Sequence, residues 1–226
     1  MLSESQAFPF PQTPAEAVNL QIRLREQVKE EPLEVDAIRL VAGTDVSFER
    51  FGSDAWAGII VVGIEDLQVV DRVVVRAPVR FPYVPGLLSF RESPPLLEAW
   101  QQLRTKPDVV LCDAHGRAHP RRFGMACHFG LLVDTPTIGC AKSLLCGEVE
   151  TMSPMGDWFP VYDGEEMIGA ALCTQPHMRP VYVSVGHRVD LPSAIEVVRR
   201  CVRGHRIPEP LRLAHELVNQ ARRASA

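Results

Sequence analysis

The 226-residue sequence lacks the features that mark membrane, exported and low-complexity proteins. Its longest apolar run, residues 55–64, is about half as long as the roughly 20 residues that a membrane-spanning helix needs. The first residues contain neither the basic start nor the apolar core of a signal peptide. Glycine and proline are scattered, and 46% of the residues are hydrophobic, which excludes collagen-like and disordered chains. We therefore expect a globular cytoplasmic protein without a membrane partner.

The six cysteines form no Cys-x-x-Cys pair and show no zinc-finger spacing to a histidine. Cys112, Cys127 and Cys201 stand among apolar neighbours, as small core residues do. We interpret the cysteines as reduced structural thiols, which agrees with a cytoplasmic compartment. His115 and His119 are four residues apart, but the proline between them argues against a zinc-binding pair.

The sequence also has fewer basic than acidic side chains. It contains 24 of the first and 28 of the second, which gives a formal net charge of −4. This total argues against a nucleic-acid partner, since such proteins usually carry a basic balance. The distribution along the chain argues the other way. Residues 104–142 contain 6 basic and 3 acidic side chains, and residues 199–226 contain 7 and 2. We expect these two basic stretches to share one face, with the candidate site between them.

The chain does contain the alternating strands and helices of an α/β protein. Three successive strands without an intervening helix predict an antiparallel meander, and a later strand–helix–strand unit predicts parallel strands joined by a right-handed crossover. We predict a single domain over residues 1–226, with a mixed sheet that is antiparallel in its first three strands, parallel afterwards, and flanked by helices. The expected strands lie near residues 38–48, 55–64, 69–75, 109–112 and 137–140, with a hairpin at 167–174 and 180–185 after a surface excursion at 147–166. The expected helices lie near residues 14–29, 93–103, 124–133, 192–202 and 208–223.

Two aspartates interrupt apolar strand-like segments. Asp45 lies within residues 40–48, and Asp113 directly follows residues 109–112. A carboxylate in a buried strand costs on the order of several kcal/mol unless it is paired or binds a cation. Ligands of open α/β sheets bind at the carboxyl ends of the strands. Either aspartate alone is more simply a strand-end cap, whereas for the pair a metal site and two caps are equally good interpretations.

Glu92 is a third candidate, at the start of a predicted helix, where the helix dipole alone favours an acidic residue. Three carboxylates form the oxygen donor set that suits Mg²⁺ or Mn²⁺ and not zinc. Such a site polarises phosphate and activates water for in-line phosphodiester cleavage. Lys142 would face the same sheet edge, although solubility is the simpler role for a single lysine. His215 alone is equally compatible with a surface or helix-face role.

Residues 81–86 (FPYVPG) combine two prolines, an aromatic residue and a glycine. Pro82 and Pro85 stiffen the backbone around Tyr83, and Gly86 permits a positive φ. A rigid projecting tyrosine could act as a wedge in a base stack. A proline-rich connector remains the simpler interpretation of this segment alone.

Basic side chains also gather just before the helix predicted at residue 124, where His119, Arg121 and Arg122 follow one another closely. The free backbone N–H groups of a helix start and nearby basic side chains together suit phosphate binding. We therefore list this segment as a candidate phosphate-binding site.

Taken together, these segments resemble the endonuclease V family, the deoxyinosine-directed nucleases of bacterial DNA repair. The resemblance covers nearly the whole chain, from the first predicted helix to the last. Its most specific parts are residues 42–48 (AGTDVSF), 82–92 (PYVPGLLSFRE) and 119–122 (HPRR), with support from 136–139 (PTIG), 186–188 (GHR) and 206–210 (RIPEP).

The resemblance implies a ribonuclease-H-like fold and a Mg²⁺-dependent endonuclease in which Mn²⁺ substitutes. Asp45, Glu92 and Asp113 fall on the family's metal-binding catalytic carboxylates. Lys142 and His215 fall on positions that assist at the active site. Family members cut the second phosphodiester bond on the 3′ side of inosine and leave 3′-hydroxyl and 5′-phosphate ends.

The resemblance also implies how the lesion is recognised. Tyr83, between Pro82 and Pro85, falls on the wedge that separates the strands beside the lesion. The deaminated base turns into a pocket built largely from backbone, whose positions here are Gly86, Leu88 and Ala114. The family usually has glycine at the last of these positions, so the extra methyl group could narrow the pocket and alter lesion preference.

The implied partner is damaged DNA that contains deoxyinosine, and we expect a monomer. Inosine-containing RNA is the alternative substrate, because some relatives act on it. A lesion-binding module without catalysis is a different class of function. The three carboxylates argue against that class, because a pure binder gains nothing from buried negative charge that faces phosphates.

Overall fold

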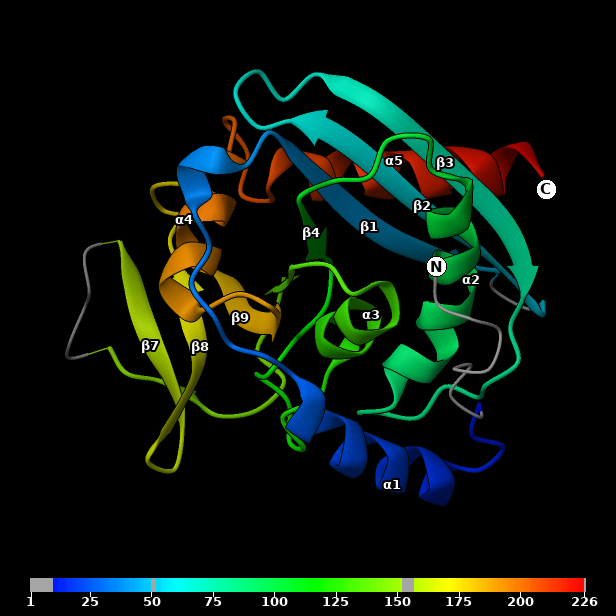
Figure 1. Ribbon diagram of the computed structural model, residues 1–226, viewed down its shortest axis with the longest axis horizontal. Helices are drawn as coiled ribbons and strands as arrows, with labels where there is room; N and C mark the ends of the chain where they lie inside the picture. The colour runs from blue at the N-terminus through cyan, green and yellow to red at the C-terminus, as the bar shows by residue number, and fades with distance from the viewer. Residues whose placement is uncertain (1–9, 50–51, 152–156, 226) are drawn as a thin grey trace.

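A nine-stranded mixed β-sheet organises the computed structural model, which describes residues 10–49, 52–151 and 157–225 (Figure 1). The strand order is β3-β2-β1-β4-β5-β9-β8-β7-β6. The strands are β1 (Leu40–Phe48), β2 (Asp54–Gly63), β3 (Val69–Pro78), β4 (Val109–Cys112), β5 (Thr137–Ala141), β6 (Glu148–Val149), β7 (Trp158–Asp163), β8 (Glu166–Leu172) and β9 (Val181–His187). The α-helices are α1 (Pro14–Leu24), α2 (Leu88–Gln102), α3 (Met125–Val133), α4 (Leu191–Arg200) and α5 (Glu209–Ala224), and short 3₁₀ turns are formed by Arg25–Gln27 and Val35–Ala37.

The predicted mixed α/β sheet flanked by helices is confirmed. β1, β2 and β3 form the expected antiparallel meander, and β4 pairs in parallel with both β1 and β5. Parallel pairing stops there, because β9, β8, β7 and β6 extend the sheet with antiparallel pairs. The expected hairpin is present as β8 and β9. The surface excursion predicted over residues 147–166 is wrong in its described part, which contributes β6 and β7.

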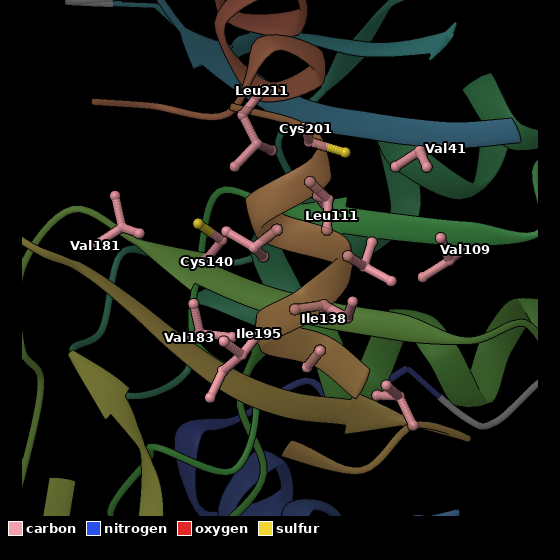
Figure 2. Close-up of a cluster of buried hydrophobic side chains, with 14 of the residues drawn as sticks. Val41, Val109, Leu111, Ile138, Cys140, Val181, Val183, Ile195, Cys201 and Leu211 are labelled. Atoms are coloured by element: carbon pink, nitrogen blue, oxygen red, sulfur yellow. The ribbon is translucent and has the colours of Figure 1, made fainter. Parts of the chain in front are cut away.

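Helices cover both faces of the sheet. Successive side chains of a strand point to opposite faces, so the central strands bury one set of residues under each layer of helices. On one face, Val41 and Leu111 pack with Ile195 of α4 and Leu211 of α5, and Figure 2 shows this cluster. On the other face, alternate residues of the same strands pack against α2 and α3. α1 lies outside α2 and α3 and closes a third apolar cluster with the segment that precedes α2 (Figure 1).

The first helix begins after Thr13, whose side chain caps its first turn. The Thr13 hydroxyl accepts a hydrogen bond from the Glu16 amide at 3.2 Å, and the Glu16 carboxylate accepts one from the Gln12 amide at 2.8 Å. The helix proper ends at Leu24, five residues before the expected end, and a 3₁₀ turn follows it. Among the described residues, no helix is both long enough and apolar enough to span a bilayer.

The second helix begins at Leu88, which corrects the predicted start near residue 93. Pro94 and Pro95 lie inside the helix and not at its first turn. Proline in a helix interior removes a backbone donor, but buried contacts hold this helix on both sides of the two prolines. Phe90 packs against the Phe81 ring at a centroid distance of 5.7 Å, and Leu96 joins the core under the sheet. Glu92 therefore lies within the helix and not at its mouth.

Candidate active site

Asp45 lies on β1 and faces α5. Gly43 shares this face of the strand, and a Cβ atom there would lie 2.2 Å from the Pro210 carbonyl oxygen, so α5 packs directly on the strand. This close approach brings His215 of α5 to the carboxylate, with 2.8 Å between His215 Nδ1 and Asp45 Oδ2. Asn219, one helical turn later, donates from Nδ2 to the His215 carbonyl oxygen at 2.8 Å. The packing of the helix thus sets the imidazole beside the carboxylate.

Asp113 follows the last residue of β4, beside Asp45. Its amide donates to the Thr44 carbonyl oxygen at 3.4 Å, which continues the parallel register of β1 and β4. Its carboxylate forms an ion pair with the ammonium group of Lys142, the residue that directly follows β5. The Lys142 carbonyl oxygen accepts a hydrogen bond from Arg206 Nη2 at 2.6 Å. Neighbouring strands therefore deliver an aspartate, a second aspartate and a lysine to one edge of the sheet.

Glu92 approaches these aspartates from α2. Burial, followed by the negative charges of Asp45 and Asp113, raises the pKa of Glu92 to about 8. Burial and then the charge of Asp113 also raise the pKa of Asp45, although the contact with His215 opposes this shift. The three carboxylates are thus close enough to repel one another, as expected for groups that share a site.

The donor set fits a hard divalent cation by its chemistry. It consists of three carboxylates whose mutual repulsion a cation would relieve. In the part of the chain that the structure describes, however, no three His, Cys, Asp or Glu side chains are placed to hold a metal ion as they stand. Asp45 is engaged by His215 and Asp113 by Lys142. Cation binding by the carboxylates therefore stays a prediction.

A cavity of about 310 Å³ opens next to Asp113. All three residues predicted for the lesion pocket line it, together with the predicted wedge residue and both partners of the lysine–aspartate pair. Tyr83 lines this cavity and is 70% exposed. The candidate residues in the lining are Tyr83, Pro85, Gly86, Leu88, Asp113, Ala114, His119 and Lys142. Other candidates, namely Pro82, Asp45, Glu92, Arg121, Arg122 and His215, are outside this lining.

The predicted phosphate-binding side chains have protein partners in the structure. His119 Nε2 lies 3.0 Å from the Gly86 carbonyl oxygen, and Arg121 Nη2 donates to the same oxygen at 2.7 Å. Burial and then the charge of Arg121 lower the pKa of His119 to about 4, so its ring is neutral at pH 7. Arg122 pairs with carboxylates on both strands of the β7–β8 hairpin. A phosphate-binding role for these three side chains stays a prediction.

The expectation that both basic stretches share one face is wrong for the start of the first stretch, although Lys142 at its end contacts Arg206 of the second. Residues 104–108 lie at the amino end of β1, where the Asp108 amide donates to the Leu40 carbonyl oxygen at 3.0 Å. Asp113 and Lys142 lie at the opposite, carboxyl edge of the parallel strands. Much of the remaining basic charge is paired, as in the contact of Arg199 with Asp157. β4 lies between residues 104–108 and the later part of the first stretch, so the basic side chains of these two parts lie at opposite edges of the sheet.

The roles of three site residues were not predicted from the sequence. Gln21 is a glutamine inside the apolar stripe of the first helix, and that placement is a usable signal. Asn219 is four residues after His215, so the helical period places it on the same face. Arg206 holds Lys142 through a backbone carbonyl oxygen, a contact that no sequence pattern announces.

Comparison with known proteins finds relatives that are similar over nearly the whole chain. The family model described as endonuclease V matches residues 22–216. Endonuclease V of Roseiflexus castenholzii is 48% identical over 218 residues, covering 95% of this chain and 96% of the relative. The crystal structure of endonuclease V from Streptomyces avermitilis superposes with a TM-score of 0.91 at 40% identity, over 96% of both chains. Ciona intestinalis endonuclease V, solved with a 24mer DNA containing an inosine followed by a ribo-adenosine, gives a TM-score of 0.86 at 27% identity, over 94% of this chain and 98% of that one.

Proposed function

The chain belongs to the endonuclease V family, and from that premise we propose that it is a DNA-repair endonuclease directed at deoxyinosine. It hydrolyses the second phosphodiester bond on the 3′ side of the lesion and leaves 3′-hydroxyl and 5′-phosphate ends. The observation that carries this proposal is the position of Asp113, which lines the 310 Å³ cavity and also stands beside Asp45. One residue thus joins a pocket large enough to hold a base to a cluster of carboxylates. The inosine-containing DNA bound by the Ciona intestinalis relative supports the same substrate.

Asp45, Glu92 and Asp113 would hold Mg²⁺, or Mn²⁺ in its place. The bound ion would supply Lewis acidity at the scissile phosphate. His215 holds the Asp45 carboxylate through the 2.8 Å contact and fixes its orientation. The Lys142 ammonium stands beside Asp113 and stabilises negative charge that develops on the phosphate.

The cavity receives the deaminated base. Hypoxanthine pairs weakly, so turning it out of the helix costs less than turning out a normal base. The exposed Tyr83 fills the gap in the stack, with Pro82 and Pro85 stiffening its backbone. Gly86, Leu88 and Ala114 line the space for the base.

Inosine-containing RNA is the second candidate substrate. The ribo-adenosine that follows the inosine in the Ciona intestinalis complex is the specific reason to keep it. Cleavage of matched deoxyinosine and inosine strands of the same sequence, side by side, ranks the two substrates. A monomer located in the cytoplasm completes the proposal. The six cysteines are free thiols, and a reducing compartment would keep them in that state.

Replacement of the aspartates tests the catalytic assignment. Asp45→Ala and Asp113→Ala are each expected to abolish cleavage of an inosine-containing duplex while the duplex still binds, as measured by gel cleavage and fluorescence anisotropy. Asp36→Ala is the matched control, because Asp36 is a surface aspartate whose partner is Arg200. Cleavage at the wild-type rate by both active-site variants would refute the assignment.

A further inference from the structure

The carbonyl oxygen of Gly86 accepts hydrogen bonds from three side chains. Gln21 Nε2 and His119 Nε2 each lie 3.0 Å from it, and Arg121 Nη2 lies 2.7 Å from it. Gly86 itself has a φ of 77°, which glycine adopts without strain. A carbonyl oxygen has two lone pairs, so this acceptor is saturated by the protein. The segment that carries Tyr83 is thus fixed at its last residue.

Gln21 is the centre of this arrangement, although it comes from α1, more than 60 residues before Gly86. Its side chain is 1% exposed. Nε2 donates to the Gly86 and Phe123 carbonyl oxygens, both at 3.0 Å, and Oε1 accepts from Arg121 Nε at 2.6 Å. The two carbonyl partners and the guanidinium partner define the orientation of the amide. A buried amide with this many partners is specified by its surroundings and is not a filler of the core.

His119 completes the arrangement in one tautomer. Its Nδ1 accepts a hydrogen bond from the Arg121 amide at 3.1 Å, so the ring proton is on Nε2 and is donated to Gly86. Arg121 contributes its backbone amide to His119, Nε to Gln21 and Nη2 to Gly86. The three side chains therefore depend on one another, and Gly86 is their common target. We call them the Gly86 clamp.

We propose that Gln21 is a positioning residue for lesion recognition, which acts by holding Gly86 and with it the wedge segment, residues 82–86, at the wall of the base pocket before DNA arrives. This inference rests on the proposed function, since it takes the cavity as the base pocket and Tyr83 as the wedge. Gln21, Gly86 and His119 all line that cavity. A segment that is already ordered loses no conformational entropy on binding, which strengthens binding without any new contact. The benefit applies to inosine-containing DNA, where the wedge inserts, and not to undamaged DNA held by its phosphates.

Gln21→Leu tests the proposal, because leucine fills the space without the amide. Asn19→Leu is the matched control, since Asn19 is an exposed amide side chain on the same helix. The DNA probes are two duplexes of one sequence, with and without a single deoxyinosine, each carrying 2-aminopurine beside the lesion position. Single-turnover cleavage at varied enzyme concentration gives the half-saturating concentration and the maximal rate. The fluorescence of 2-aminopurine reports unstacking by the wedge.

Gln21→Leu is expected to raise the half-saturating concentration for the inosine duplex at least about tenfold, as the loss of one or two buried hydrogen bonds implies. The maximal rate stays within about twofold by the same reasoning, because the Asp45, Glu92 and Asp113 carboxylates are untouched. The 2-aminopurine signal falls, binding of the undamaged duplex is unchanged, and Asn19→Leu behaves as the wild type. All assays are run well below the lowest melting temperature of the set.

A folded Gln21→Leu protein with the wild-type half-saturating concentration and fluorescence signal would overturn the inference. An equal loss of binding to both duplexes would overturn it as well, because that pattern indicates general damage. If Gln21→Leu does not fold, Gln21→Met decides by the same criteria, since methionine is unbranched and adapts to the buried space but lacks the amide. Failure of the wild type to cut the inosine duplex would instead refute the proposed function, so the two failures are distinguishable.

Discussion

At the scale of single residues, the site gathers negative charge that destabilises the folded chain. Glu92 is the clearest case, because burial and the charges of Asp45 and Asp113 raise its pKa to about 8. Its ordinary value is 4.5, so ionised Glu92 is less favourable in the folded than in the unfolded chain. The free energy of unfolding therefore decreases progressively as the pH rises from 4.5 through 8, because the unfolded chain releases the Glu92 proton first. Active sites commonly hold such unfavourable groups.

Glu92→Gln is accordingly expected to stabilise the fold while it abolishes cleavage. At pH 8 the free energy of unfolding should rise by roughly 1 to 3 kcal/mol, and at pH 5 by much less, because Glu92 is then protonated in the folded protein. Urea denaturation at the two pH values measures the difference. Glu98→Gln, an exposed change on the same helix, serves as the control. A destabilised Glu92→Gln protein, or a gain that is the same at both pH values, would contradict the electrostatic account.

At the scale of elements, the contact of α5 with β1 sets the position of His215. A Cβ atom at Gly43 would lie 2.2 Å from both the carbonyl carbon and oxygen of Pro210, and 2.7 Å from the Leu211 nitrogen. These are backbone atoms, so the helix cannot yield by turning a side chain. Glycine at this strand position is thus required for the distance between the helix and the sheet, and with it for the contact between His215 and Asp45.

Gly43→Ala is expected to displace α5 and to cost about 1 to 3 kcal/mol of folding stability, as overpacked cores do. Cleavage should fall to the level of a His215→Ala variant, because both changes remove the imidazole from Asp45. Thermal melting and single-turnover cleavage of the inosine duplex test the two parts separately. An alanine variant that melts and cuts like the wild type would show that the helix does not depend on this contact.

The elements also show what the sequence can and cannot predict. Apolar strands such as β1 and β4 were predicted to within about two residues of their bounds, because burial on both faces leaves a plain pattern. The start of α2 was placed five residues late, since Pro94 and Pro95 are typical of a first turn and tertiary packing overrides that preference. β7 was missed because it contains Pro160, which it tolerates next to the two-residue edge strand β6.

At the scale of the whole molecule, the fold brings distant segments to one sheet edge. Asp45 and Asp113 could be selected from the sequence because a charged residue in or directly after a buried strand demands an explanation, whereas Glu92 gained weight only beside them and through the family resemblance. The engagement of the two aspartates by His215 and Lys142 could not be predicted, since it depends on how helices and strands pack. The same holds for the Gly86 clamp, in which α1 and residues 119–121 supply the donors to a carbonyl oxygen of a third segment. The net charge of −4 adds together the charges of ion-paired side chains, clustered carboxylates and free surface residues, so it does not indicate the binding partner.

The central claim is that this arrangement cuts DNA beside deoxyinosine with the help of a divalent cation. The most direct measurement is cleavage of one end-labelled duplex with a single deoxyinosine, in Mg²⁺ and in EDTA, with the cut mapped to the nucleotide and an undamaged duplex alongside. The account predicts a single cut at the second phosphodiester bond 3′ to the lesion, in Mg²⁺ only, with 3′-hydroxyl and 5′-phosphate ends. Equal cleavage in EDTA, a cut at another position, or equal cutting of the undamaged duplex would contradict it.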